Sequence, residues 1–456
     1  MTKNVTLVLF GGTGDLTKRK LIPAFSKLHE ADIISDKSIV VGVGRSEYTD
    51  ETYAKLIHQS VTSKKERDCL KGITIKYFRT DSSKPDGLKG LAKKLKTWEQ
   101  GKKSERIFYF ATTYTIFPQI ISNISQEKLQ KNCKVVFEKP FGNSSQSAHT
   151  LQKHISTHFT EDQVYRIDHY LGKETVRNVN ALRFTNTVID AMLCAKHVKS
   201  ISVIARENLS VKDRLGYYDS AGSVKDMIQS HLLQVVALLL MDRPSAKTAE
   251  CFQDEKVKIL QKIQVADASK HLLGQYKGYA TELAKVGFIE SRTDTYSNIE
   301  FRCDHPRWKG IPITIETGKE MNTKEGKIII EFQQVTDELS KTGYTNVQPN
   351  RLVIDIHPEE DITIFFNTRK RYTDGELEQV GMSFCGNCHF GKNTNDGYVK
   401  LLKDVVNGDK TLCIRDDELA ESWNITDKIE SQRPHICFVQ YEKGSTSEQI
   451  NKLRTK

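Results

Sequence analysis

Near its start the chain reads Val5-Thr6-Leu7-Val8-Leu9-Phe10-Gly11-Gly12-Thr13-Gly14-Asp15-Leu16, an apolar strand-like run followed by a glycine-rich turn. A dinucleotide fingerprint requires this context, because glycines permit a tight turn and let backbone N–H groups approach a pyrophosphate at a helix N-terminus. Thr17 stands where G-x-G-x-x-G has its third glycine. The stretch therefore favours a nucleotide site at residues 11–16, with a plain strand–helix turn as the alternative.

The alternation that begins at this turn continues through the first 170 residues. Strand-like runs recur at Val5–Phe10, Ile39–Val43, Ile73–Phe78, Ile107–Ala111 and Lys134–Phe137. Amphipathic segments of helical length lie between and after them, at Lys18–Glu30, Asp50–Ser60, Asp86–Trp98, Phe117–Leu129 and Ser144–Thr157. Because right-handed crossovers join such strands, the pattern predicts a Rossmann-like, doubly wound parallel sheet over residues 1–172. Pro23 lies inside the first helical segment and is expected to kink it.

The pattern changes after about residue 175. Strand-like runs follow at Ile201–Arg206, Ile311–Thr317, Lys327–Gln333, Leu352–His357 and Ile362–Phe366, and some are close enough to pair antiparallel. Helical patterns occupy Ser223–Met241 and residues 395–430. The pattern predicts an α+β domain over residues 173–456, with one large, mostly antiparallel sheet and helices on a face. A chain of 456 residues is too long for one core, so two domains are expected.

The charge balance limits the classes of partner. Lys and Arg number 68 against 58 Asp and Glu, a formal net charge of +10 that favours anionic partners. The basic residues are scattered rather than clustered, so a nucleic-acid partner is not expected. No apolar run approaches the roughly 18 residues of a membrane span, and the N-terminus lacks a cleavable signal pattern. A cytoplasmic protein without a membrane partner is therefore expected.

The nine cysteines are mostly isolated and typical of reduced thiols in a cytosolic protein. One cluster, Cys385-Gly386-Asn387-Cys388-His389, matches the C-x-x-C-H pattern of haem attachment and half of a redox or zinc site. Haem attachment needs export, and a structural zinc needs a second ligand pair that the sequence does not offer, so no metal site is expected. A chance match and a thiol switch through Cys385 and Cys388 both stay open.

The end of the second predicted strand bears on the choice of cofactor. An NAD site usually places an acid there to hold the ribose hydroxyls. Here the strand ends in Gly44-Arg45-Ser46, with no acid before Glu47. A guanidinium and a hydroxyl suit a 2′-phosphate, so Arg45 and Ser46 favour NADP. The alternative is that Arg45 is only a solvated charge at a strand end.

Two further positions carry titratable groups where chemistry could occur. Lys139 follows the fifth predicted strand and precedes Pro140, so it should lie at the carboxyl edge of the sheet, where ligands of such sheets bind. Pro140 restricts Lys139 to extended geometry, and a cis peptide is compatible with this position.

His231 falls on the apolar stripe of the helix predicted at residues 223–241, and Asp226 lies near the start of that helix. A hydrogen-bonded core histidine and a first-turn acid that complements the helix dipole are the alternatives.

The segment Arg166-Ile167-Asp168-His169-Tyr170-Leu171-Gly172-Lys173-Glu174 combines an acid, a histidine, a tyrosine and a lysine with little apolar content. Such groups need partners if buried, and a surface loop is the alternative. The segment closely matches the glucose-6-phosphate dehydrogenase family. Four other segments follow in the order of that family: Gly11–Lys18, Glu138–Gly142, Asp226–Leu232 and Gly318–Asn322. The chain resembles the family over nearly its whole length.

The resemblance implies a glucose-6-phosphate 1-dehydrogenase that oxidises D-glucose 6-phosphate to 6-phospho-D-glucono-1,5-lactone with hydride transfer to NADP, the first step of the oxidative pentose phosphate pathway. His231 would be the general base for the anomeric hydroxyl, and Asp168 would fix its tautomer. The residues that would bind the 6-phosphate are His169, Tyr170, Lys173 and Lys324. Those that would bind sugar hydroxyls are Lys139, Glu207, Asp226 and Lys319, with Lys139 also touching the cofactor. A homodimer or homotetramer is expected.

The chain departs from the family at three places. Ala111-Thr112-Thr113-Tyr114 replaces the common Ala-Leu-Pro-Pro, and Phe117 stands where a tyrosine often contacts the cofactor. Glu316 stands where animal members carry an arginine of a second, structural NADP site, so the resemblance does not imply that second site here, and its presence stays open. Another NAD(P)-dependent sugar dehydrogenase and a catalytically idle regulatory paralogue remain as alternatives.

Overall fold

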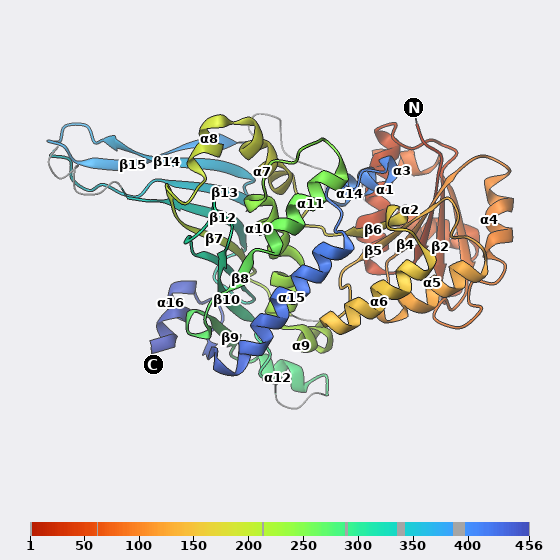
Figure 1. The fold of residues 1–456 in the computed structure, drawn as a ribbon. Helices are drawn as coiled ribbons and strands as arrows, with labels where there is room; N and C mark the ends of the chain where they lie inside the picture. Colours follow the sequence, from red (N-terminus) through yellow and green to blue (C-terminus); the bar gives the residue numbers. More distant parts are fainter. Residues whose placement is uncertain are drawn as a thin grey trace. The chain divides into compact units, whose positions relative to one another are not determined.

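The computed structural model describes residues 2–61, 63–211, 214–287, 291–334, 343–385 and 397–455. These residues form two compact units. The first comprises Met1–Gly172, Ala246–Gln253 and Asn395–Ala420, and the second comprises Lys173–Ser245, Asp254–Thr394 and Glu421–Lys456. Each unit is built around its own β-sheet (Figure 1). The assignment of cofactor binding to residues 1–172 and of substrate binding to residues 173–456 stays a prediction.

The first unit contains a six-stranded sheet in which all neighbouring strands are parallel. In the order β3-β2-β1-β4-β5-β6, its strands are Thr74–Arg79, Ile39–Gly44, Val5–Phe10, Glu105–Phe110, Cys133–Glu138 and Val164–Ile167. The predicted Rossmann-like sheet is confirmed. The sequence pattern does not predict β6, because a strand of four residues is too short to show a period.

Helices connect these strands and cover the sheet. They are α1 (Ile22–Glu30), α2 (Asp50–Gln59), α3 (Lys64–Leu70), α4 (Leu91–Glu99), α5 (Phe117–Gln126) and α6 (Ser145–His158), with the 3₁₀ turns η2 (Tyr114–Ile116) and η3 (Glu161–Gln163). The first predicted helix is divided into a π-helical turn, η1 (Thr17–Leu21), and α1. Pro23 lies in the first turn of α1, where a missing N–H is tolerated, so the change of helical register falls beside the proline.

A helix from late in the sequence completes the first core. Buried side chains of α14 (Gly397–Asn407) join the cluster formed by β1, α1 and their neighbours, and Figure 1 draws α14 in blue beside α1 in red. The ammonium groups of Lys3 and Lys134 donate to the Val406 carbonyl at the end of α14, at 2.7 and 3.2 Å. Positive charge at a helix C-terminus is favourable, so these lysines fasten α14 to the unit.

The second unit contains a ten-stranded sheet. Its main path, β15-β14-β13-β12-β7-β11-β10-β9-β16, comprises Leu377–Cys385, Asp361–Arg369, Arg351–His357, Glu325–Phe332, Val198–Arg206, Ile313–Gly318, Tyr296–Cys303, Leu272–Tyr276 and Cys437–Tyr441, and β8 (Ile263–Val265) pairs with β10. Among the described strands of this second sheet, only the β7–β11 and β9–β16 pairs are parallel. The predicted large, mostly antiparallel sheet is confirmed.

Helices pack with this sheet. They are α7 (Glu174–Thr185), α8 (Thr187–Met192), α9 (Leu215–Ser223), η5 (Val224–Leu232), α10 (Leu233–Leu240), α12 (Tyr279–Ala284) and α16 (Ser447–Lys452), with the 3₁₀ turns η6 (Ala268–Lys270), η8 (Arg433–His435) and η9 (Leu453–Thr455). The residues of α11 (Ala249–Leu260) and α15 (Asp416–Gln432) are divided between the two units. The helix predicted at residues 223–241 is π-helical in its first half, η5, and α-helical in its second half, α10.

Two sequence-level expectations concern the surroundings of the protein. Among the described residues, no helix has the length and hydropathy of a transmembrane segment. Seven cysteines of the described part of the chain are free thiols: Cys69, Cys133, Cys194, Cys251, Cys303, Cys413 and Cys437. Cys385 ends β15, and the rest of the C-x-x-C-H segment lies outside the described residues, so the thiol switch stays a prediction.

Candidate active site

The glycine-rich turn after β1 is closely packed against β2. Gly11 has a φ of +84°, and the N–H groups of Gly11 and Gly12 both donate to the Val43 carbonyl at 3.1 Å. A Cβ at Gly12 would lie 2.6 Å from the Cα of Gly42, so only glycine fits. Thr17 occupies the third-glycine position, and its hydroxyl donates to the Gly11 carbonyl at 2.9 Å. The threonine thus closes the turn by a hydrogen bond.

A tyrosine that no sequence motif indicates packs against this turn and donates a hydrogen bond to it. The Tyr53 hydroxyl, carried by α2, donates to the Gly12 carbonyl at 2.8 Å. Its ring fills the space over Gly42, where a Cβ would come within 2.2 Å of it. No spacing rule in the sequence connects residues 12, 42 and 53. The remaining turn residues are accessible to a ligand, since Thr13, Gly14 and Leu16 are half-buried and Asp15 is exposed.

The carboxyl edge of the first sheet carries the other predicted groups of this unit. Arg45 and Ser46 are exposed directly after β2. Lys139 is half-buried directly after β5, and the Lys139–Pro140 peptide bond is cis. Asp168 follows β6. Because carboxyl ends of parallel strands meet at one edge, the residues predicted to bind a nucleotide and Lys139 share this edge.

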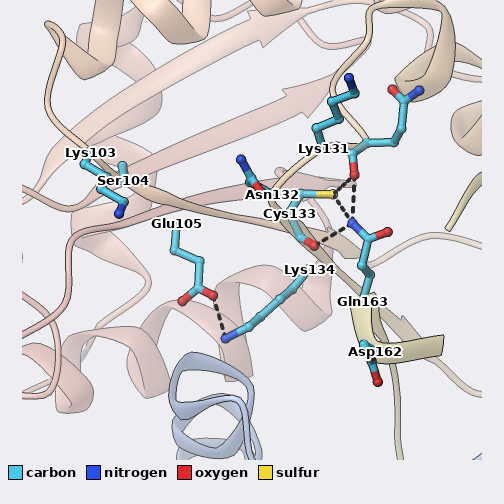
Figure 2. Close-up of a pocket in the computed structure, with 10 residues that line it drawn as sticks. Lys103, Ser104, Glu105, Lys131, Asn132, Cys133, Lys134, Asp162 and Gln163 are labelled. Carbon is cyan, nitrogen blue, oxygen red and sulfur yellow. Dashed lines mark hydrogen bonds and ion pairs between the residues drawn. The ribbon is translucent and has the colours of Figure 1, made fainter. Parts of the chain in front are cut away.

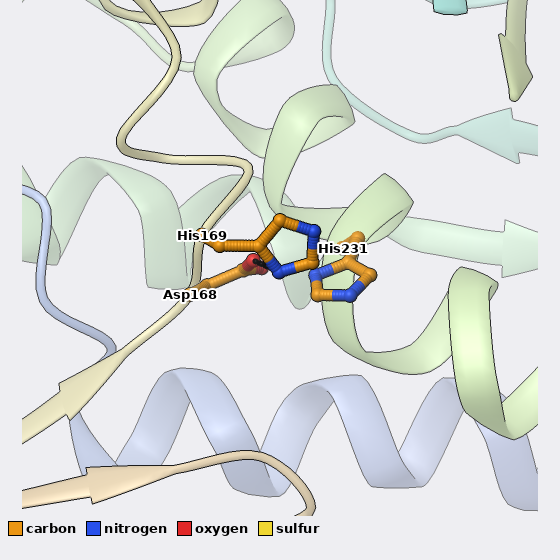
Figure 3. Close-up of side chains that lie close together, drawn as sticks. All are labelled: Asp168, His169 and His231. Carbon is orange, nitrogen blue, oxygen red and sulfur yellow. Dashed lines mark ion pairs between the residues drawn. The ribbon is translucent and has the colours of Figure 1, made fainter. Parts of the chain in front are cut away.

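Asp168 is almost fully buried, with 2% of its surface exposed. Its Oδ1 accepts the Tyr170 N–H at 2.9 Å and lies 3.9 Å from Nδ1 of His169 (Figure 3). The backbone of Gly397 packs directly against the turn that carries these residues. A Cβ at Gly172 would lie 2.6 Å from the Gly397 carbonyl oxygen. The predicted polar segment is therefore an ordered turn, with its acid inside.

Glu138, the last residue of β5, is a titratable group that the sequence analysis leaves without a role. Its carboxylate accepts the hydroxyls of Tyr109 at 2.5 Å and Tyr398 at 3.2 Å. Burial raises the pKa of Glu138 from 4.5 to about 7, the charge of Asp168 also raises it, and the two hydroxyls and Lys139 act in the opposite direction. A carboxyl group that titrates near neutrality thus lies at the same edge as Lys139.

In the second unit, η5 carries Asp226 and His231, which are 5% and 1% exposed. The start of η5 is held by the Asp294 carboxylate, which accepts the Ser223 hydroxyl at 2.5 Å and the Val224 N–H at 3.1 Å. Arg433 donates to the same carboxylate at 2.7 Å. A buried acid at a helix N-terminus is favourable, so this contact fixes where η5 begins.

A second group of polar residues surrounds Lys319, just after β11. The Lys319 ammonium donates to the Glu207 carboxylate and lies 4.0 Å from Oδ2 of Asp226. It also lies 5.7 Å from the centre of the Tyr218 ring. The predicted sugar-binding residues Glu207, Asp226 and Lys319 are therefore brought together, and they can offer both donors and acceptors to hydroxyl groups.

The charges of the two predicted phosphate lysines of this unit act on a histidine to which no sequence motif assigns a role. Burial, together with the positive charges of Lys173 and Lys324, lowers the pKa of His357 from 6.5 to about 4. His357 ends β13 and packs on the start of β12, where a Cβ at Gly326 would lie 2.6 Å from its Nε2. The position of His357 just before a proline gives no sequence indication of this neighbourhood.

The predicted site residues thus form one set in each unit. The first unit holds residues 11–16, Arg45, Ser46, Lys139, Asp168, His169 and Tyr170; the second holds Lys173, Glu207, Asp226, His231, Lys319 and Lys324. Figure 3 draws His231 on η5. The hydrogen bond expected between Asp168 and His231 stays a prediction.

A cavity of about 970 Å³ lies at the opposite edge of the first sheet (Figure 2). It is lined at the amino ends of β4 and β5, where Lys134 pairs with Glu105 at 2.8 Å. The Gln163 amide donates to the carbonyls of Gln130 and Cys133 at 2.7 and 3.1 Å. Burial raises the pKa of the Cys133 thiol to about 12, so this thiol is unreactive near neutral pH. Nucleotides bind at carboxyl ends of strands, so the cavity is not the candidate nucleotide site.

Comparison with known proteins agrees with this arrangement. Residues 8–178 match the model of the glucose-6-phosphate dehydrogenase NAD binding domain, and residues 180–454 match that of the glucose-6-phosphate dehydrogenase C-terminal domain. The chain belongs to the glucose-6-phosphate dehydrogenase family. The resemblance noted in the sequence is confirmed, and membership makes the chain an oxidoreductase.

Individual relatives cover nearly the whole chain. Glucose-6-phosphate 1-dehydrogenase of Bacillus subtilis is 33% identical over 441 residues, covering 93% of this chain and 90% of the relative. The enzyme of Borreliella burgdorferi is 33% identical over 463 residues, covering 97% and 95%. A solved structure, glucose-6-phosphate dehydrogenase in complex with its substrate glucose-6-phosphate, has a TM-score of 0.89 at 29% identity and covers 100% of this chain and 98% of that one.

The departures from the family have structural counterparts. Phe117 is buried, and its ring centre lies 5.2 Å from that of Phe110 and 5.3 Å from that of Phe137. It is a core residue beneath the carboxyl edge. Glu316 accepts a hydrogen bond from Arg206 at 2.6 Å. Glu316 is therefore committed to an ion pair inside the second unit.

Proposed function

We propose that this protein oxidises D-glucose 6-phosphate at C1 to 6-phospho-D-glucono-1,5-lactone with NADP as hydride acceptor. The observation that carries the proposal is the arrangement inside the second unit. There His231 is buried on η5, Glu207 and Asp226 lie beside Lys319, and the charges of Lys173 and Lys324 both act on His357, which supports the site that the family resemblance implies. These groups supply a base, hydroxyl partners and a phosphate site.

In the proposed mechanism His231 is the general base. It takes the proton of the anomeric hydroxyl, because an imidazole has an ordinary pKa close to working pH. The Asp168 carboxylate would fix its tautomer and stabilise the imidazolium that forms. Lys173, Lys324, His169 and Tyr170 would hold the 6-phosphate. Proton abstraction contributes about 10²–10⁴-fold, so holding the sugar in position must supply much of the remaining acceleration.

NADP fits the residues of the first unit. The turn at Gly11 and Gly12 has no room for side chains, and the accessible residues that follow it, Thr13 to Leu16, would receive the pyrophosphate. Arg45 and Ser46, exposed after β2, would bind the 2′-phosphate, and Lys139 would contact both cofactor and sugar. Bound NADP supplies the hydride acceptor. The preference for NADP over NAD belongs to the proposal.

A homodimer or homotetramer also belongs to the proposal. The hairpin of β14 and β15 exposes apolar side chains on one face, because Val380, Met382 and Phe384 alternate along β15 and are 46%, 68% and 49% exposed. Phe366 faces Val380 across the pair and is 41% exposed. Apolar surface of this kind is typical of an interface between copies. The cytoplasmic location stays a prediction.

One assay tests the proposal. Purified protein is supplied with NADP or NAD and with glucose 6-phosphate, glucose or fructose 6-phosphate, and reduced nicotinamide is followed by its absorbance. We expect turnover with glucose 6-phosphate, strongly reduced turnover with glucose, none with fructose 6-phosphate and a higher kcat/KM with NADP. Absence of turnover with glucose 6-phosphate under both cofactors would refute the proposed activity.

A further inference from the structure

The carboxyl ends of β2 and β3 carry a compact group of charged residues beyond Arg45. The two strands are parallel neighbours in which Gly44 pairs with Arg79, and the Thr80 N–H donates to the Gly44 carbonyl at 2.8 Å. Arg45 follows Gly44 directly, so the two arginines end adjacent strands at the same edge of the sheet. This is the edge at which the ribose of a dinucleotide lies in a doubly wound fold.

Each arginine has an acid beside it. Arg79 forms an ion pair with Glu47, the first acid after β2. Hydrogen bonds from Ser83 lower the pKa of Asp81, and the nearby charge of Arg45 contributes to the same shift. Two cations and two anions therefore lie at this edge of the sheet.

The Arg79–Glu47 pair is easily opened. The two side chains are 56% and 77% exposed, and an ion pair in such surroundings is worth at most about 1 kcal/mol. A phosphate dianion carries twice the charge of a carboxylate and accepts two parallel N–H bonds from a guanidinium. It can therefore replace Glu47 as the partner of Arg79.

We propose that Arg79 is a second arginine for the 2′-phosphate of NADP and that Glu47 competes with the phosphate for it. This inference rests on the proposed use of NADP. Glu47 also stands close to where NAD-binding folds place the acid for the ribose hydroxyls. Arg79 thus has two effects, because it attracts the phosphate and it occupies the carboxylate that would favour NAD.

The plain alternative is a surface ion pair without a ligand. The two readings differ in the sign of the Glu47 effect. If Glu47 competes for Arg79, then removing its charge strengthens binding of the 2′-phosphate. If the pair only stabilises the surface, then both substitutions have the same small effect on stability and none on binding.

The test uses 2′,5′-ADP and 5′-AMP, which contain the adenosine end of NADP with and without the 2′-phosphate and do not depend on turnover. Isothermal titration at low salt compares the full-length protein with Arg79→Gln, Glu47→Gln and Arg45→Gln. Lys71→Gln is the matched control, because Lys71 forms an exposed ion pair with Asp68 at 2.7 Å beyond the opposite end of β3. It removes the same charge from the same unit.

We expect Arg79→Gln to weaken 2′,5′-ADP about fivefold and Glu47→Gln to strengthen it about threefold, with 5′-AMP unchanged in both. Arg45→Gln should weaken 2′,5′-ADP at least as much as Arg79→Gln. If Arg79→Gln changes 2′,5′-ADP binding no more than Lys71→Gln does, the role of Arg79 is overturned while NADP preference stands. If the unsubstituted protein binds 2′,5′-ADP no more tightly than 5′-AMP, both the inference and the NADP preference are overturned.

Discussion

The Glu138→Gln substitution should remove a specific part of the pH dependence of stability. The pKa of Glu138 rises from 4.5 to about 7 on folding. Below about pH 4.5 the carboxyl group is protonated in both states. Between about pH 4.5 and 7 only the folded state keeps the proton, so stability falls as the pH rises. The contribution of Glu138 is therefore fully present in acid and lost by neutral pH.

The size of this effect follows from the displacement of the pKa. Two and a half pH units at about 1.4 kcal/mol each give an upper figure of about 3.5 kcal/mol. Glu138 is half-buried rather than fully buried, so solvent screening reduces the expected value to about 1–3 kcal/mol. Glutamine does not titrate. The free energy of unfolding of Glu138→Gln, relative to the unsubstituted protein, should thus rise by this amount between about pH 5 and 8.

Urea denaturation followed by circular dichroism at several pH values measures this difference. Tyr398→Phe provides a second arm, because the Tyr398 hydroxyl donates to Glu138 and lowers its pKa. Loss of this hydroxyl should extend the decline in stability to higher pH. In the double variant Glu138→Gln/Tyr398→Phe this decline should be absent. A constant stability difference between Glu138→Gln and the unsubstituted protein across this range would show that Glu138 titrates at an ordinary pKa.

Three further predictions concern single contacts. Lys173→Ala should raise KM for glucose 6-phosphate by about tenfold or more and leave oxidation of free glucose unchanged. Steady-state kinetics on both sugars measures this, and equal effects on both sugars would contradict a role of Lys173 in phosphate binding. Gly42→Ala should lower stability by about 1–3 kcal/mol, since its Cβ would meet the Tyr53 ring, and an unchanged melting temperature would contradict this. Asp294→Ala should lower the free energy of unfolding by about 1–3 kcal/mol in urea denaturation because the buried Val224 N–H and Ser223 hydroxyl lose their acceptor, and an unchanged free energy of unfolding would argue against the cap on η5.

The sequence predicts the architecture well where periodicity is strong. The strand predicted at Val5–Phe10 has the observed bounds, because a fully apolar run ends at a glycine turn. The predicted helix at 223–241 has the right extent, but the sequence does not predict its π-helical first half, whose start is held by Asp294 from a distant loop. Hydrogen-bond register inside a helix is set by such tertiary contacts, which a local pattern does not contain.

In the candidate site, too, local patterns predict some residues and tertiary contacts determine others. Family motifs indicate Asp168, His231 and Lys319, because those residues lie inside recognisable runs. Tyr53 and His357 could not be predicted, since each matters through neighbours far away in the chain. Local motifs therefore identify chemical groups, whereas the residues that orient them emerge only after folding.

The central claim is that His231 removes the proton from the anomeric hydroxyl, and the kcat of His231→Asn tests it most directly. Asparagine keeps much of the shape of the imidazole but cannot accept the proton, and the fold is checked by circular dichroism. We expect kcat to fall at least about a hundredfold while glucose 6-phosphate still binds, as a fluorescence or calorimetric titration would show. A folded variant that loses less than about tenfold in kcat would contradict the assignment of His231 as the base.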